Sequence, residues 1–352
     1  MKALITGGVG FIGQWTARRM ASRGWDVVAL DSLSPQVHAD PDSAVRAFPG
    51  TVIRGDVTDR SVWRQSSRPD VVIHLAAETG TAQSMYEVER YRGVNVGGTR
   101  MAADQASEWG VPLVAMSSRA VYGEGRYRHP DGTVTFDSPE DPDASPEASR
   151  ESDDHRPVSV YGETKSEAEA LLTATARQIP VSVVRPQNVV GPGQALHNPY
   201  TGVLAAFLAR MREGKPLLVY GDGLQTRDFV AVQDVAVLLH WLAEHPTPLG
   251  AVRTLNVGTG VRTAMNEIAE YALSGAPDGG HGIEHVDIHR AGDIIHACSD
   301  QSTSRELGAP QPAITTRDAV ASFITWSWDK PGVSSQLWDD ALQELADRGL
   351  SH

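Results

Sequence analysis

The first half of the chain alternates short apolar segments with longer segments of helical periodicity. Apolar runs of this length, rich in Val, Ile and Leu, are typical of strands that are buried on both faces of a sheet. We expect such strands at Lys2–Thr6, Asp26–Leu30, Thr51–Arg54, Asp70–Leu75, Val111–Met116 and Val181–Arg185. Strands that alternate with helices form βαβ units, so the pattern predicts an α/β fold with a doubly wound parallel sheet.

The pattern becomes less regular after Arg185, where prolines and glycines interrupt it more often. We expect a sheet domain, a smaller C-terminal lobe and a terminal helix. Their predicted ranges are 1–185 with re-entry near 228–256, then 186–227 together with 257–330, and finally 331–352. The segment 124–157 is rich in Asp, Glu, Ser and Pro, which predicts a long solvated loop.

The composition narrows the class of protein. The chain has 352 residues, a formal net charge of −13 and a single cysteine, Cys298. An acidic chain disfavours binding to nucleic acid or to anionic membranes, because both need a basic surface. No apolar run reaches about 18 residues, and the N-terminus lacks the features of a secretory signal peptide. We therefore expect a cytoplasmic protein without a membrane partner.

A glycine-rich turn lies between the first strand and the first helical segment. Gly7, Gly10 and Gly13 have the spacing G-x-x-G-x-x-G. Glycine permits a tight turn and lets the backbone approach a pyrophosphate, while the following helix N-terminus presents free N–H groups to that anion. An ordinary structural turn is the alternative. The position between a strand and a helix favours a Rossmann-type dinucleotide site.

Further positions indicate which dinucleotide binds. Asp31 ends the second strand, 18 positions after Gly13, where a carboxylate would bind the hydroxyls of the adenosine ribose. No arginine stands beside Asp31 to bind a 2′-phosphate, so we expect NAD rather than NADP. Asp56 follows the third strand and can accept a hydrogen bond from the adenine amino group. The predicted NAD contacts are Gly7, Gly10, Phe11, Ile12, Gly13, Asp31, Ser32, Asp56, Val57, Leu75, Ala76, Ala77, Asn95, Ser117, Tyr161, Lys165 and Pro186.

Tyr161 and Lys165 are four positions apart, which places both on one face of a helix. A nearby ammonium lowers the pKa of a tyrosine from its usual value of about 10. The phenolate can then take a hydroxyl proton while a hydride leaves the same carbon for NAD. Ser117 and Ser118 follow the fifth strand, at the sheet edge where ligands bind. The spacing Y-x-x-x-K is common, so its value depends on the dinucleotide site that precedes it.

Several of these motifs occur together: T-G-G-V-G-F-I-G, H-L-A-A, S-S-R-A-V-Y-G, Y-G-E-T-K and R-P-Q-N-V-V-G-P-G. In this combination the chain resembles the extended short-chain dehydrogenases/reductases, and within them the NAD-dependent nucleotide-sugar epimerases and dehydratases. The resemblance implies that Ser118 is catalytic together with Tyr161 and Lys165, and that Arg227 and Arg290 bind the diphosphate of a nucleotide sugar. The implied substrate contacts are Thr79, Ser84, Ser118, Arg119, Asn188, Val203, Tyr220, Arg227, Arg290 and Asp293.

The residues after Ser118 differ between the reactions of this family. Dehydratases that the chain resembles carry Asp-Glu there and decarboxylating members carry Glu, whereas this chain has Arg119 and Ala120. We therefore expect an isomerase of carbohydrate biosynthesis, similar to the dTDP-L-rhamnose and UDP-sugar 4-epimerases. A nucleotide-sugar 4-ketoreductase or dehydrogenase and a non-catalytic NAD-binding protein are the alternatives. The resemblance also implies a homodimer, and the absence of cysteine from 123–157 implies no zinc.

Overall fold

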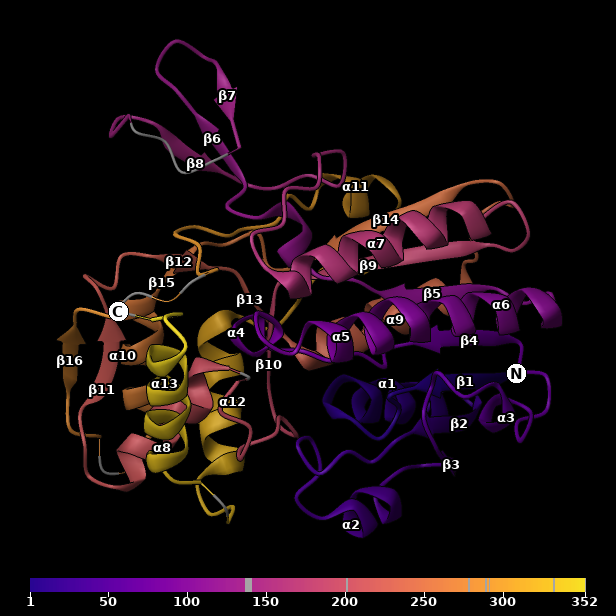
Figure 1. The fold of residues 1–352 in the computed structure, drawn as a ribbon, viewed down its shortest axis with the longest axis horizontal. Coiled ribbons are helices and arrows are strands. Elements are labelled where there is room, and N and C mark those ends of the chain that lie inside the picture. Colours follow the sequence, from indigo (N-terminus) through magenta and orange to yellow (C-terminus); the bar gives the residue numbers. More distant parts are fainter. Residues whose placement is uncertain are drawn as a thin grey trace.

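The computed structural model describes residues 1–136, 141–200, 202–277, 279–288, 290, 292–331 and 333–351. Seven parallel strands form the main sheet (Figure 1). Their order is β14 (Val252–Val257), β9 (Val181–Pro186), β5 (Leu113–Met116), β4 (Val71–His74), β1 (Lys2–Thr6), β2 (Asp26–Asp31) and β3 (Thr51–Arg54). All six strands expected from the sequence lie in this sheet, which confirms the α/β, Rossmann-type fold. The strand order reverses at β1 and β4, where open α/β sheets bind ligands at the carboxyl ends of their strands.

Helices cover both faces of the sheet, which explains the uninterrupted apolar runs of its strands (Figure 1). Ala3 and Ile5 of β1 pack against α1 (Phe11–Ala21) and α9 (Val232–Glu244). Leu4 points to the opposite face, because successive side chains of a strand alternate. That face is covered by α3 (Arg60–Trp63), α6 (Thr99–Trp109) and α7 (Val160–Thr175). The segments α5 (Val88–Tyr91) and η1 (Arg92–Gly98), the latter a π-helix, lead directly into α6.

A second hydrophobic core lies beside the sheet domain, at the left of Figure 1. Its helices are α8 (Val203–Arg212), α10 (Met265–Gly275) and α12 (Thr316–Ser327). Its short strands pair as β10 (Asn188–Val190) with β13 (Phe229–Ala231), β11 (Leu217–Tyr220) with β16 (Ile283–Val286), and β12 (Thr226–Arg227) with β15 (Thr263–Ala264). The elements α9 and β14 pack with the main sheet, although they lie between these segments in the chain. The exact residue limits of the two lobes stay a prediction.

Three further helices are α2 (Pro41–Arg46), α11 (Ser302–Glu306) and α13 (Gln336–Asp347). The last of these lies within the segment 331–352, where a C-terminal helix was expected. None of the helices in the described part of the chain is long and apolar enough to cross a membrane.

The acidic segment 124–157 differs from the expected loop. Its described part contains an antiparallel sheet that projects at the top of Figure 1, in the order β7 (Val134–Thr135), β6 (Arg126–Arg128) and β8 (Ser145–Glu147). Arg126 pairs with Glu147 and with Asp153, and its guanidinium lies over the ring of Phe136. Some of the acidic side chains are therefore paired with arginine rather than solvated. Residues 137–140 of this segment lie outside the described residues.

Candidate active site

The glycine-rich turn joins β1 to α1 at the carboxyl edge of the sheet. Gly7 has a left-handed conformation with φ of 63°, and a Cβ atom there would lie 2.9 Å from the backbone nitrogen of Ala76. A Cβ atom on Gly13 would lie 2.6 Å from the Cα atom of Gly8. No side chain in the described part of the chain caps α1 at Gly10, so the first N–H groups of the helix can bind an anion. The turn therefore fits the pyrophosphate of a dinucleotide.

Asp31 ends β2 beside this turn and is only 6% exposed. Its carboxylate accepts hydrogen bonds from the backbone N–H groups of Val9 and Leu33, each at 2.9 Å. These bonds hold the acid next to the glycine turn, the position from which it would bind a ribose hydroxyl. Nε2 of His38 lies 3.6 Å from Oδ1 of Asp31, a contact that no motif in the sequence indicated.

The other predicted cofactor positions differ in their surroundings. Residues 75–77 follow β4 beside the glycine turn, and the N–H groups of the first two donate to the Thr6 hydroxyl. Asn95 is buried, and its amide bonds to the backbone of Glu78 and to the Thr164 hydroxyl, so it braces this segment against α7. Asp56 is exposed and accepts hydrogen bonds within its own turn. The remaining positions begin α1, or end or follow strands at the carboxyl edge: Phe11, Ile12, Ser32, Val57, Ser117 and Pro186.

Tyr161 and Lys165 both lie in the first two turns of α7. The Nζ atom of Lys165 is buried, donates to the carbonyl oxygen of Met116 at 3.0 Å, and lies 6.0 Å from the centre of the Tyr161 ring. Ser118 caps the 3-10 turn η2 (Arg119–Tyr122), which begins three residues after the end of β5, and its hydroxyl is close enough to Tyr161 to lower the pKa of that residue. The structure thus brings together the three residues predicted to be catalytic.

Burial and neighbouring charges shift the pKa values of this pair. Burial raises the pKa of Tyr161, while the hydroxyl of Ser118 and the positive charge of Arg119 act in the opposite direction. Burial lowers the pKa of Lys165 to about 8, and the negative charge of Glu169 opposes that shift. The ammonium is therefore mostly protonated near neutral pH.

A buried ionic network that the sequence analysis missed lies behind Lys165. Glu169 is one turn further along α7, and its carboxylate accepts three hydrogen bonds from the Arg185 guanidinium at 2.6 to 3.2 Å. The hydroxyl of Ser117 also donates to Glu169, and Nε2 of His155 lies 3.5 Å away. Glu169 and Arg185 are 6% and 4% exposed. The sequence did contain one sign of this contact: Lys165 and Glu169 are four positions apart, so they share one face of the helix.

Three of the predicted substrate-binding residues are arginines whose charges act on one another. Burial, with the neighbouring charge of Arg227, lowers the pKa of Arg119 to about 10. Burial also lowers the pKa of Arg227, and Arg290 adds to that effect. The guanidinium of Arg290 pairs with Asp293 at 3.0 Å and lies over the ring of Tyr220, 5.2 Å from its centre. The arrangement concentrates positive charge, as a diphosphate site requires.

Glu124 was also missed, and it holds the segment that positions Arg227. Its carboxylate accepts the backbone N–H groups of Ile295 and His296 at 2.9 to 3.0 Å. The guanidinium of Arg227 in turn donates to the carbonyl oxygens of Ile294 and Ile295. Nothing in the sequence pattern marked this role of Glu124, because the two backbone N–H groups that it binds lie more than 170 positions further along the chain.

Other predicted substrate positions have structural partners. Ser84 is fully buried, and its hydroxyl accepts the backbone N–H of Tyr161 at 3.0 Å and donates to the carbonyl of Thr81, within α4 (Thr81–Ser84). Ser84 therefore positions α7. Thr79 is exposed and its carbonyl accepts the hydroxyl of Tyr91 at 2.6 Å. Two half-buried positions begin elements of the second lobe: Asn188 and Val203.

Comparison with known proteins establishes the family. Residues 3–258 match the model of the NAD dependent epimerase/dehydratase family. The chain belongs to this family. A dTDP-L-rhamnose 4-epimerase of Burkholderia thailandensis is 36% identical over 349 residues, which cover 92% of this chain and 94% of that protein. A dTDP-glucose 4,6-dehydratase of Streptomyces griseus is 30% identical over 348 residues, which cover 93% and 96%.

A solved structure agrees with these matches. The UDP-glucose 4-epimerase of Thermus thermophilus, in complex with NAD, superposes with a TM-score of 0.76 at 26% identity and covers 94% of this chain and 100% of that one. Family membership confirms the predicted resemblance and the dependence on NAD. Overall identity alone does not separate epimerase from dehydratase, because relatives of both kinds share 30% or more of the sequence.

Proposed function

We propose that this protein epimerises the C4 carbon of a nucleotide-diphosphate sugar through a transient 4-keto sugar. The observation that carries the proposal is the position of Arg119. This cation directly follows Ser118 in the chain, and its positive charge lowers the pKa of Tyr161. Elimination of water needs an acid that protonates the leaving hydroxyl. On the substrate side, Glu124 is bound by two backbone N–H groups, and Asp293 is paired with Arg290. Both carboxylates are thus engaged in holding the site together.

The chain's own residues supply proton transfer and orientation. Tyr161 takes the proton of the C4 hydroxyl, with the phenolate stabilised by the ammonium of Lys165 and by Arg119. The hydroxyl of Ser118 lies beside Tyr161 and would orient the same sugar oxygen. The glycine turn and Asp31 would hold NAD, which would supply the hydride acceptor for C4 and the hydride donor for the return step. The keto sugar must rotate between the two hydride transfers, so that the hydride returns to the other face of the C4 carbon.

Arg227 and Arg290 would anchor the diphosphate while the sugar turns. Both guanidiniums are held in place, Arg227 by the carbonyls of Ile294 and Ile295 and Arg290 by Asp293. Anchoring at the diphosphate leaves the sugar ring free to present either face, which a 4-epimerase requires. We further propose that the protein acts in the cytoplasm, in carbohydrate biosynthesis, and as a homodimer.

A panel of dTDP- and UDP-sugars, followed by proton NMR at C4, tests this function. The expected result is interconversion of two C4 epimers without net oxidation or reduction of NAD. Steady consumption of NADPH or NADH by a 4-keto sugar would instead indicate the reductase alternative. Tyr161→Phe should reduce turnover by roughly 10²- to 10⁴-fold while NAD stays bound. Tyr271→Phe, on α10 of the second lobe, is the matched control and should keep full activity.

A further inference from the structure

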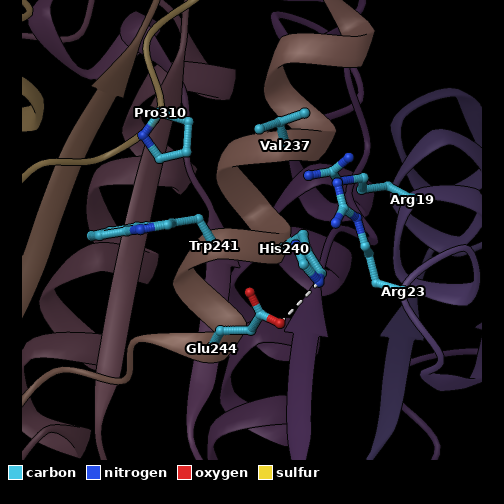
Figure 2. A pocket seen from close by; sticks show the side chains of 7 residues that line it. All are labelled: Arg19, Arg23, Val237, His240, Trp241, Glu244 and Pro310. Carbon is cyan, nitrogen blue, oxygen red and sulfur yellow. Dashed lines mark ion pairs between the residues drawn. The ribbon is translucent and has the colours of Figure 1, made fainter.

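A cleft of about 390 Å³ lies between α1 and α9, far from the candidate active site along both helices. The N-terminus of α1 begins at the glycine turn, whereas the cleft is lined by Arg19 of its last turn and by Arg23 just beyond its end. From α9 the cleft receives His240 and Glu244 of the last turn. Figure 2 shows the two arginine side chains reaching towards His240.

Two buried nitrogen atoms of the cleft lining have no hydrogen-bond partner among the described residues: Nε of Arg19 and Nε2 of His240. His240 is 5% exposed, and its ring lies 6.3 Å from that of Trp25 in an edge-on arrangement. Nε2 of His240 is within ion-pair distance of Glu244, at 3.3 Å, but the two atoms lack hydrogen-bond geometry. Buried donors without acceptors are unfavourable, so these atoms favour a bound acceptor.

The charges in the cleft indicate what kind of acceptor fits. Neither Arg19 nor Arg23 forms an ion pair within the described part of the chain, although the chain as a whole carries a charge of −13. Basic residues at a helix C-terminus often donate to its last carbonyl oxygens, but within the described residues neither guanidinium does so here. The pKa of His240 is lowered, first by burial and also by Arg19 and Arg23, which places both cations close to the ring.

We propose that the cleft binds a phosphate group, either as inorganic phosphate or as a phosphate monoester. A tetrahedral oxyanion can accept hydrogen bonds from several directions at once, as the two guanidiniums and the imidazole offer them. Glu244 also lines the cleft, and its negative charge disfavours ligands that carry a high negative charge. Trp241 and Pro310 form an apolar wall that suits the carbon skeleton of a monoester. This site is independent of the proposed function.

Calorimetric titration of the NAD-loaded protein with inorganic phosphate tests the proposal, with chloride holding the ionic strength constant. Arg19→Gln/Arg23→Gln should weaken binding at least tenfold. The control pair Arg18→Gln/Arg46→Gln removes the same charge from exposed positions and should leave the dissociation constant within twofold. Equal effects of the two pairs, or heats that chloride reproduces, would overturn the proposal. Phosphate that bound only at Arg227 and Arg290 would be insensitive to both pairs, and that result would overturn it too.

Two further measurements do not depend on the stability of those variants. Glu244→Gln removes the repelling carboxylate and should tighten phosphate binding severalfold. In the unmodified protein, the ring-proton resonances of His240, assigned with His240→Asn, should shift on addition of phosphate; unmoved resonances at saturation count against the site. A titration with glucose 1-phosphate distinguishes the two sources, because only a monoester that uses the Trp241 wall should bind more tightly than phosphate itself.

Discussion

Replacement of Glu169 by glutamine tests how much a buried ion pair of α7 stabilises the fold. An exposed ion pair on the same helix serves for comparison. Glu169 and Arg185 are 6% and 4% exposed and share three hydrogen bonds of 2.6 to 3.2 Å. Removing one charge of a buried pair leaves the other without its counter-ion, which costs about 3 to 5 kcal/mol. The control is Glu167→Gln, because Glu167 pairs with Arg92 at 3.0 Å with both side chains nearly half exposed. Such a surface pair contributes about 0 to 1 kcal/mol.

Urea unfolding followed by far-ultraviolet circular dichroism measures both free energies. Glu169→Gln should lower the free energy of unfolding by at least about 3 kcal/mol, a large part of the roughly 5 to 15 kcal/mol typical of a folded protein. Glu167→Gln should change it by less than about 1 kcal/mol. If the two variants unfold at the same urea concentration, the buried network does not stabilise the fold as argued.

The same variant reports on catalysis through Lys165. Glu169 raises the pKa of Lys165 against the lowering effect of burial, which brings that pKa to about 8. Without the carboxylate the pKa falls further, so the ammonium loses its proton at a lower pH. The alkaline limb of the profile of kcat against pH should therefore move to lower pH in Glu169→Gln and stay in place in Glu167→Gln.

Three other substitutions test separate parts of the site. Gly13→Ala should lose bound NAD and about 1 to 3 kcal/mol of stability, because its Cβ atom would overlap the glycine turn, whereas Gly93→Ala, with no atom within 4 Å, should keep NAD and gain about 0.5 to 1 kcal/mol. Arg119→Gln removes a charge that lowers the pKa of Tyr161, so the acid limb of kcat should move to higher pH; an unchanged profile would contradict the proposed contact. Asp31→Asn should reduce the preference for NAD over NADP about tenfold in a cofactor titration, because the carboxylate that repels a 2′-phosphate is gone.

Local patterns in the sequence were enough to predict six strands of the main sheet and the glycine turn, and to place Tyr161 and Lys165 on one face of a helix. Each depends on residues that are near one another in the chain, so periodicity and spacing carry the information. The resemblance added Ser118 and the arginines of the second lobe, since motifs preserve their order along the chain. The segment 124–157 was the clear error, because its acidic composition favoured a solvated loop while its arginines form pairs across a small sheet.

The sequence by itself determined the family and the cofactor, and it predicted the residues at the core of the candidate site. Only the tertiary structure showed what holds that site: Glu169 against Arg185, Glu124 against the segment that positions Arg227, and Ser84 against α7. The cleft between α1 and α9 is of the same kind, since its residues come from segments more than 200 positions apart. Such contacts depend on how helices and strands pack in the folded protein. No local pattern of residue types encodes that packing.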